Sequence, residues 1–285
     1  MKTVLIVLAV SLLVAAAILE SADYRWRVRT RALVAALRQD GPRVAPATFS
    51  AEQLAALPAP VRRYFTAVLP EGQPLARHVR LAQQGTFLVK PESNGWAPFT
   101  AVQDFRVVPA AFVWDARIRM GHGLTVRVRD SFVDGMGSMF GAAMAVVTVV
   151  RMENTPDMAV AALMRYLAEA CWFPTALLPS QGVRWEGIDA SRARATLTDG
   201  PTTVWSEFRF GPDGLVTSIY TPARPRTVGT AVVPTAWQGR WTAWAVRNGM
   251  RVPSAGEAEW LLPDGPLVYW RGRIRRISYD WAPGS

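Results

Sequence analysis

The first nineteen residues constrain this chain more than any other segment. From Thr3 to Leu19 every side chain is apolar or small, and the first acidic residue is Glu20. A run of about 17 such residues is at the lower limit of what crosses a ~30 Å hydrocarbon core as a helix. The competing interpretation is a cleaved secretory signal, with Lys2 as its basic end and the alanines at 15–17 as its cleavage site.

The residues behind this run favour an uncleaved anchor. The apolar run continues past the alanine cluster, and residues 24–31 combine aromatic rings with arginines, as is typical of a segment at a membrane interface. We therefore expect residues 1–40 to form a transmembrane anchor and a basic juxtamembrane helix. More basic residues follow the run than precede it, which favours a cytoplasmic location for the rest of the chain. Export of that domain is the alternative.

The charge balance favours lipid over nucleic acid as a partner. The formal net charge of +10 and the isoelectric point near 10.7 invite a nucleic-acid interpretation. Only Lys2 and Lys90 are lysines, however, and the many arginines are spread along the chain instead of forming one block beyond the anchor. We expect attraction to anionic lipid headgroups, worth about 1 kcal/mol per basic residue near a membrane surface, and no nucleic-acid partner.

The few cysteines and histidines exclude several classes of site. Cys171 is the only cysteine, which rules out a disulfide framework, a CxxC redox pair and a thiolate zinc cage. His78 and His122 are the only histidines, so a histidine-rich metal site is excluded as well. The GxGxxG, P-loop, GxSxG and HExxH motifs are absent. We expect no metal and no cofactor.

Between the anchor and the main domain, residues 41–75 are predicted to form a linker with short helices. Proline and alanine between Pro42 and Thr48 indicate the linker itself. A capping box at Ser50 predicts one short helix, reaching Leu57. A second helix is predicted over Val61–Leu69, after a proline and before another.

Residues 76–285 are predicted to form a mainly β (α+β) domain: a curved antiparallel sheet or half-barrel packed on one main helix. Alternating apolar and polar side chains and frequent turn signals, such as Asn248-Gly249, indicate the strands. Thr155 as N-cap, with proline and aspartate after it, predicts the helix over about 156–170. The predicted strands are Val79–Val89, Phe99–Val107, Phe112–Met120, Leu124–Val133, Arg192–Thr198, Thr202–Phe210, Leu215–Tyr220, Arg240–Arg247, Met250–Leu262 and Val268–Trp281.

One hairpin can be paired residue by residue from the sequence. If residues 121–123 form a three-residue loop, Met120 lies opposite Leu124, and the pairing continues back to Phe112 opposite Phe132. One face of the hairpin is then apolar except for a single aspartate. The apolar residues of this face are candidates for the wall of a ligand cavity: Phe112, Trp114, Ile118, Met120 and Phe132.

Asp130 is the acidic residue on this apolar face. Among aromatic rings it could have a raised pKa and serve as an acid or base. The commoner alternative is a carboxylate that simply accepts a hydrogen bond from an indole N–H.

The opposite face of the hairpin carries four charged residues. Asp115 lies opposite Arg129, which forms a sensible cross-strand ion pair. Arg117 lies opposite Arg127, and two opposed arginines cost energy unless an anion or another carboxylate lies between them. Arg117 and Arg127 could therefore bind a phosphate or carboxylate headgroup. They could also form a solvated arginine face.

Four further residues have simple structural interpretations. His122, between two glycines, is typical of an exposed turn, and Cys171, beside aromatic residues at a helix end, is typical of a packed small hydrophobe. Glu257 and Glu259 share one face of a strand but have no partner motif that would indicate glycosidase chemistry.

Several phrases resemble a bacterial family known only as a membrane-associated domain of unknown function, over about Leu57 to the end. This resemblance implies a bacterial membrane-associated protein and implies no catalytic residues. Together with the anchor expected from the apolar run, it leads us to expect a single-pass protein of the bacterial inner (cytoplasmic) membrane. The phrases are Leu57–Tyr64, Phe112–Arg117, Arg165–Glu169, Trp172–Pro179 and Tyr269–Arg273.

The order of strands and helix, with the closing segments Trp237–Arg240 and Asn248–Pro253, is also similar to the half-barrel lipoprotein carriers of the LolA/LolB kind. That likeness implies an open sheet that cradles acyl chains. The sequence has no cysteine near the leader to carry the lipid of the LolB members.

These observations lead to three hypotheses of function. The first is a membrane-anchored domain that binds a lipid or other long hydrophobic ligand. The second is an enzyme that acts on a hydrophobic substrate, with Asp130 as acid or base. The third is a scaffold that binds another membrane protein.

Overall fold

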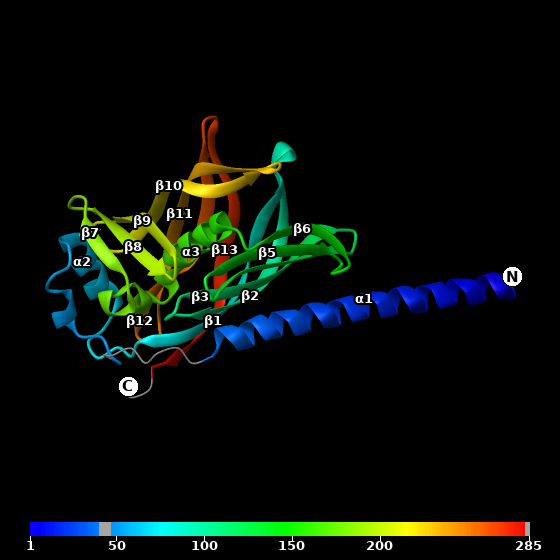
Figure 1. The fold of residues 1–285 in the computed structure, drawn as a ribbon, viewed down its shortest axis with the longest axis horizontal. Coiled ribbons are helices and arrows are strands. Elements are labelled where there is room, and N and C mark those ends of the chain that lie inside the picture. Colours follow the sequence, from blue (N-terminus) through cyan, green and yellow to red (C-terminus); the bar gives the residue numbers. More distant parts are fainter. Residues whose placement is uncertain (40–46, 283–285) are drawn as a thin grey trace.

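The computed structural model describes residues 1–39 and 47–282, which form one long N-terminal helix and one β domain (Figure 1). The predicted anchor and juxtamembrane segments are a single continuous helix, α1 (Lys2–Leu37). By length and composition α1 is the one described helix that could cross a membrane, and its most apolar stretch is fully exposed. This stretch projects away from the domain (Figure 1). The predicted linker, Pro42–Thr48, lies almost entirely outside the described residues.

The described strands form one antiparallel sheet of 13 strands in the order β6-β5-β4-β3-β2-β1-β13-β12-β11-β10-β9-β8-β7. The mainly β fold class predicted from the sequence is therefore confirmed. The strands are β1 (Ala76–Lys90), β2 (Gly95–Arg106), β3 (Ala111–Gly121), β4 (Leu124–Val133), β5 (Met136–Ala143), β6 (Val147–Glu153), β7 (Arg184–Gly187), β8 (Arg192–Asp199), β9 (Thr202–Phe210), β10 (Val216–Val228), β11 (Ala231–Arg247), β12 (Met250–Leu262) and β13 (Gly265–Trp281).

The sequence pattern does not predict β5, β6 or β7. β5 contains two glycines and two alanines, residues that are depleted in strands, so its propensity is weak. β7 has only four residues, too few for alternation to be recognised. These three strands lie at or next to the two edges of the sheet, where the pattern of burial on two faces is least regular.

A row of glycines crosses the middle of the sheet. Gly85 of β1 lies opposite Gly272 of β13, which in turn lies opposite Gly256 of β12. An added Cβ at Gly272 would lie 2.2 Å from the Trp270 ring, and one at Gly256 would lie 2.5 Å from the Trp241 ring. Glycine in a strand permits a sharp bend and close approach of a ring to the backbone. The row therefore lets the sheet curve while large indoles line its concave face.

Helix α3 (Pro156–Glu169) lies in the hollow of the curved sheet, against β4, β5, β9 and β10 (Figure 1). The sequence signals for its start are confirmed, since the Thr155 hydroxyl accepts a hydrogen bond from the backbone N–H of Met158 at 3.2 Å. The first turn approaches β5 at Gly137, where any Cβ would lie 2.4 Å from the Met158 carbonyl oxygen. α3 thus fills one side of the hollow.

The other end of the domain is closed by short helices. The helix predicted from Ser50 is a single 3-10 turn, Ala51–Leu54, and the second is α2 (Ala59–Val68). Tyr64 and Phe65 of α2 are fully buried in the main hydrophobic core. Trp172, in the turn that follows α3, is buried in the same core.

The predicted β3–β4 register is confirmed from Phe112 opposite Phe132 to Arg119 opposite Thr125. The turn differs from the prediction. Gly121, not Met120, lies opposite Leu124, and the register shifts between residues 119 and 121. The turn therefore has two residues, His122 and a glycine, both with positive φ (49° and 77°), as a type I′ hairpin requires.

Candidate functional site

A cavity of about 420 Å³ lies between the concave face of the sheet and α3. This volume is within the range of about 300–1,000 Å³ typical of small-molecule sites. Most of the wall is apolar or aromatic, and strands from both halves of the sheet contribute to it. The apolar and aromatic lining residues are Phe87, Trp114, Ile118, Val128, Met139, Val150, Met152, Met158, Ala161, Ala162, Ala168, Pro225, Trp237, Trp241, Ala258, Trp260, Tyr269 and Trp270.

The deep end of the cavity carries a buried ion-pair network centred on Arg165 of α3. Its Nη1 lies 2.5 Å from Asp130 Oδ2 of β4, and its Nε lies 2.9 Å from Glu169 Oε1, one helical turn later. Burial opposes the charge of Arg165, but the two carboxylates outweigh it and raise the pKa of the guanidinium. Burial raises the pKa of Glu169, and Arg165 offsets part of that shift. Arg165 therefore stays charged and ties α3 to β4.

The network continues to Trp114 through two buried amides. Gln103 Nε2 donates to Glu169 Oε2 at 2.7 Å, and Gln83 Nε2 donates to Gln103 Oε1 at 3.1 Å. The Trp114 indole N–H then donates to Gln83 Oε1 at 2.9 Å. The partner of Asp130 is thus Arg165 and not an indole, contrary to the simpler of the two sequence interpretations. Such a fully bonded chain fixes the deep wall of the cavity.

The outer end of the cavity carries two arginines from β10. Arg224 lies over the rings of Trp237 and Trp260, 5.1 and 5.4 Å from their centroids, and Arg226 lies 5.5 Å from the Trp260 centroid. Arg224 also donates to the Tyr269 hydroxyl at 3.3 Å. Both arginines are half-buried, and the next residues of β10, Thr227 and Val228, are exposed, so the arginines mark the mouth of the cavity.

The end of β10 reaches across the hollow toward the other edge of the sheet. Arg224 donates to the carbonyl oxygen of Ala161 in α3 at 3.3 Å, and Thr227 Oγ1 lies 3.3 Å from Met152 Sδ of β6. The register of β10 against β11 shifts between Thr221 and Arg224, where the strand turns toward α3. The β10 residues from 224 to 227 therefore form the outer rim that bridges the two halves of the sheet.

The structure separates the cavity-wall candidates that the hairpin pattern grouped together. Trp114 and Ile118 line the cavity. Phe112 and Phe132 are fully buried in the core and do not line it, although the Arg165 guanidinium lies 5.1 Å from the Phe112 centroid. Met120, near the hairpin turn, is 37% exposed and lies outside the lining.

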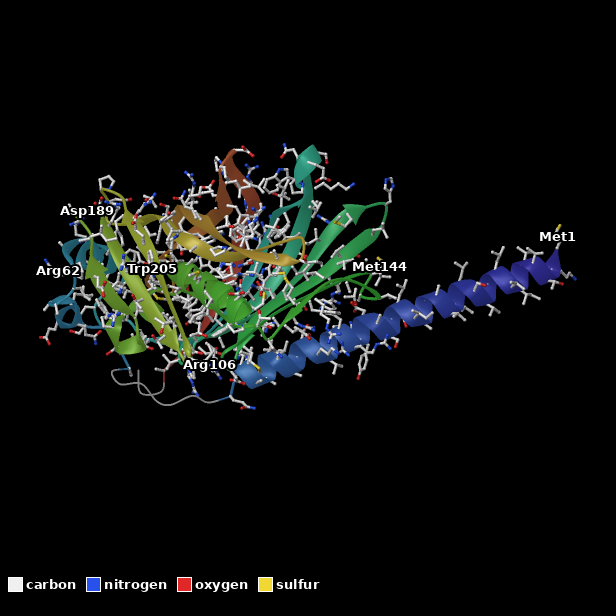
Figure 2. The ribbon with its side chains drawn as sticks, turned by 45° about the horizontal axis from the view of Figure 1, so that its top comes forward. Met1, Arg62, Arg106, Met144, Asp189 and Trp205 are labelled. Atoms are coloured by element: carbon white, nitrogen blue, oxygen red, sulfur yellow. The ribbon has the colours of Figure 1, made fainter. Side chains whose placement is uncertain are left out.

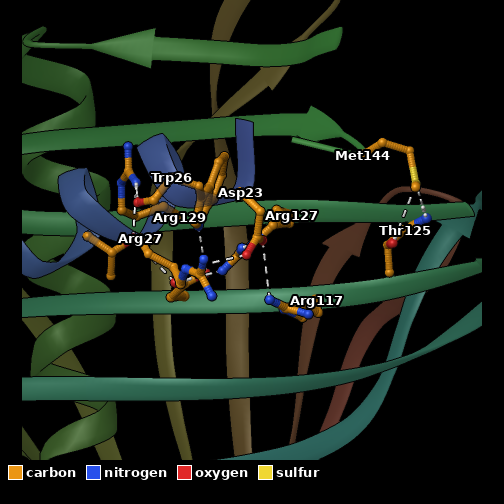
Figure 3. A network of polar contacts seen from close by, with 10 residues as sticks. Asp23, Trp26, Arg27, Arg117, Thr125, Arg127, Arg129 and Met144 are labelled. Carbon is orange, nitrogen blue, oxygen red and sulfur yellow. Dashed lines mark hydrogen bonds and ion pairs between the residues drawn. The ribbon is translucent and has the colours of Figure 1, made fainter. Parts of the chain in front are cut away.

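Arg117 and Arg127 lie on the opposite, convex face, where α1 packs against β2, β3 and β4. Asp23 of α1 lies between them and forms ion pairs with Arg127 and with Arg117, the latter at 3.3 Å (Figure 3). Asp115 Oδ2 also lies 3.4 Å from Arg127 Nη2. The carboxylate that two opposed arginines require is therefore supplied by α1, so the headgroup site suggested by the sequence is occupied by the protein's own side chain.

Trp26 is a buried contact of α1 with the convex face. Its indole N–H donates to Asp115 Oδ1 at 3.0 Å, and its ring stacks on Phe140 at 5.6 Å between centroids. Asp115 lies opposite Arg129 in the register, but its carboxylate bonds to Trp26, Thr30 and Arg127, while Arg129 donates to Thr30. The predicted Asp115–Arg129 ion pair is replaced by this three-element network.

The hairpin tips on this side lie beside the point where α1 leaves the domain. Met144, at the β5–β6 turn, is close to α1 (Figure 2) and shares a small surface hollow with Leu19 and Asp23. Together with Trp26 and the arginines, these contacts form a joint between α1 and the convex face, made by α1 residues 19–37. We call it the α1 joint.

The other residues singled out from the sequence lie in environments that indicate a structural role. Cys171 is buried, and burial raises the pKa of its thiol. His122 is exposed at the turn. Glu259 is buried and accepts hydrogen bonds from Gln238 and Arg240. Among the residues that the structure describes, no group of three or more His, Cys, Asp or Glu side chains could hold a metal ion.

The comparisons identify the family of this chain. A family of unknown function, DUF6544, matches residues 47–272, and the chain belongs to this family. The resemblance to an uncharacterised family noted in the sequence is therefore confirmed. A comparison with curated proteins finds no significant match. Among solved structures, the crystal structure of a LolA superfamily protein from Nitrosomonas europaea matches with 10% identity and a TM-score of 0.35, covering 80% of this chain and 96% of that chain.

Proposed function

We propose that this protein binds a lipid or other long apolar molecule in the cavity between the sheet and α3, while α1 anchors it in a membrane. The observation that supports this proposal is the cavity itself. It has about 420 Å³ of space, and its wall is largely tryptophan, methionine and aliphatic side chains. Leaving such surface open to water costs about 25 cal/mol per Å² of apolar area, a cost that a bound apolar molecule removes.

The ion pair of Asp130 with Arg165 favours binding over catalysis. The Asp130 carboxylate accepts a charge-assisted hydrogen bond from Arg165 at 2.5 Å inside a satisfied network, so its bonding capacity is already used within the protein. It also has a structural task, since it holds α3 to β4. The proposal therefore assigns Asp130 to the architecture of the cavity.

The test is whether purified protein carries a cargo that depends on the cavity. Full-length protein extracted in mild detergent should contain co-extracted lipid detectable by mass spectrometry. Val128→Phe places a ring in the cavity and should reduce this cargo at least several-fold. Val246→Phe is the matched control, because Val246 is a strand residue that is 70% exposed and lies outside the cavity.

The outcomes separate the hypotheses. Equal cargo in both variants would contradict binding in this cavity. Substrate that accumulates only in Asp130→Asn, with product in the wild type, would instead indicate an enzyme. No cargo in any protein would favour a scaffold that binds another membrane protein.

The anchoring part of the proposal has its own test. The full-length protein should sediment with membranes after carbonate extraction and should keep Met1, because the apolar stretch of α1 has no partner within the domain. A soluble product that begins after Ala17 would contradict it. Alkaline phosphatase fused after Ser285 should be inactive if the domain is cytoplasmic, and activity would show that the domain is exported.

A further inference from the structure

The carboxylates that line the cavity are already paired with arginines. Asp130 and Glu169 share Arg165 at the deep end. Glu257 lies 2.9 Å from the guanidinium of Arg271. The deep end thus has two carboxylates for one guanidinium, and none of these acids is available to the mouth.

The two arginines at the mouth have no such compensation. Among the described residues, neither Arg224 nor Arg226 forms an ion pair. The hydrogen bonds of Arg224, to the Ala161 carbonyl and the Tyr269 hydroxyl, are long, at 3.3–3.4 Å. Arg226 makes no hydrogen bond within the described chain, and its ring contact with Trp260 is shared with Arg224. Two half-buried positive charges therefore converge on one ring.

Two like charges against the same ring repel each other, and an anion bound between them relieves this repulsion. A guanidinium is also the side chain best suited to bind a carboxylate or phosphate through two parallel hydrogen bonds. The ring contacts hold both side chains against Trp260 and so reduce the entropy lost when an anion binds.

We infer that the ligand of the cavity is an anionic amphiphile whose carboxylate or phosphate headgroup is bound by Arg224 and Arg226. This inference rests on the proposed function. The apolar tail extends inward past Trp237 and Trp260 toward Trp114. The guanidinium of the deep end, Arg165, is already bound by Asp130 and Glu169, so the headgroup lies at the mouth and the tail enters first.

The test compares amphiphiles that differ only in the headgroup. Palmitate, hexadecanol and hexadecyl phosphate compete with one apolar fluorescent probe for the full-length protein at a fixed detergent concentration. We expect palmitate and hexadecyl phosphate to bind roughly tenfold or more tightly than hexadecanol, the advantage of a charge-assisted pair. Inorganic phosphate alone should not compete, because it lacks the tail.

Substitutions then test whether the arginines at the mouth cause this difference in affinity. Arg226→Gln, which breaks no hydrogen bond within the described chain, should remove most of the advantage of palmitate over hexadecanol. Arg226→Lys, which keeps the charge, should retain part of it. Arg251→Gln is the control, because Arg251 is exposed on β12 and lies outside the cavity lining.

Two failures are distinguishable. If all three amphiphiles bind equally and Arg226→Gln changes nothing, the cavity binds apolar molecules without recognising an anion, and this inference is wrong while the proposed function stands. If no amphiphile displaces the probe, the proposed function fails too. Competition by inorganic phosphate alone would show a free-anion site at the mouth and would overturn the assignment to an amphiphile.

Discussion

The arginines on the two faces of this sheet differ in whether a carboxylate of the protein balances their charge. On the convex face, Arg117 and Arg127 lie opposite each other, and Asp23 of α1 lies between them. At the mouth of the concave face, Arg224 and Arg226 lie on one strand over one tryptophan ring, with no carboxylate from the described chain. On the convex face, carboxylates of the protein itself balance the arginines. At the mouth of the concave face, no carboxylate of the described chain does so.

This difference indicates which face is a joint and which is a site. A protein that neutralises its arginines uses them to hold its own elements together, as the α1 joint does. Arginines that remain uncompensated and half-buried beside an apolar cavity have a cost in the free protein, and a ligand of opposite charge removes it. The following predictions test this comparison from the largest expected effect to the smallest.

The largest effect on stability is expected when the Arg165 ion-pair network at the deep end of the cavity is broken. Arg165→Met leaves Asp130 and Glu169 buried without their cation, which should lower the free energy of unfolding by about 3–5 kcal/mol. Chemical denaturation of the full-length protein measures this. The exposed pair Arg184–Glu186 provides the control: Arg184→Gln should cost less than about 1 kcal/mol. A small loss for Arg165→Met would mean that the network does not hold α3 to the sheet.

The next effect concerns the α1 joint. Arg127→Gln removes a side chain that is 8% exposed and bonded to Asp23 and Asp115, and it should cost about 1–3 kcal/mol. Arg117→Gln is the matched control, since Arg117 is 53% exposed and bonds to the same Asp23, and should cost less than about 1 kcal/mol. Faster amide exchange in α1 residues 22–37 of Arg127→Gln would locate the loss in the joint. Equal stability of the two variants would show that α1 does not compensate Arg127.

The smallest effect is a pH dependence near the C-terminal end of α1. Burial, together with Arg38, Arg77 and Arg106, lowers the pKa of His78, while Asp280 opposes this shift. The native state therefore favours the neutral imidazole, so His78 contributes stability above its usual pKa near 6.5, and this contribution is lost as the pH falls through the lowered value. His78→Asn should lose less stability than the wild type between about pH 7 and pH 5, measured by denaturation at each pH. A larger acid-induced loss in the variant would contradict the sign.

The features that could be predicted from the sequence are those that depend on residues close together in the chain. The β3–β4 register follows from alternation along one hairpin, and the start of α3 follows from Thr155 and the residues beside it. The turn at Gly121 is misassigned because two-residue and three-residue loops differ by one residue in a glycine-flanked stretch. Local pattern places Trp114 and Ile118 in one row, but it cannot tell them from Phe112, which is buried in the core and does not line the cavity.

The polar contacts on both faces join residues that are far apart in the sequence, so local sequence pattern cannot predict them. Asp23 and Arg127 are 104 residues apart, and Arg224 contacts Ala161 from 63 residues away. Only the fold brings these residues together. The one available signal was the opposed arginine pair itself, which required a carboxylate from elsewhere in the chain. No comparable signal marks Arg224 and Arg226 as cavity residues, because only the fold brings this part of β10 over the hollow.

A photoreactive palmitate analogue tests the central distinction between the two faces most directly. After irradiation of full-length protein with the analogue, labelled residues are located by peptide mass spectrometry, with excess palmitate as competitor. The account predicts competable labelling on the cavity wall, at Met139, Met152, Trp237 and Trp260, and none in the α1 joint at Trp26. Competable labelling at Trp26, with the cavity wall unlabelled, would contradict it.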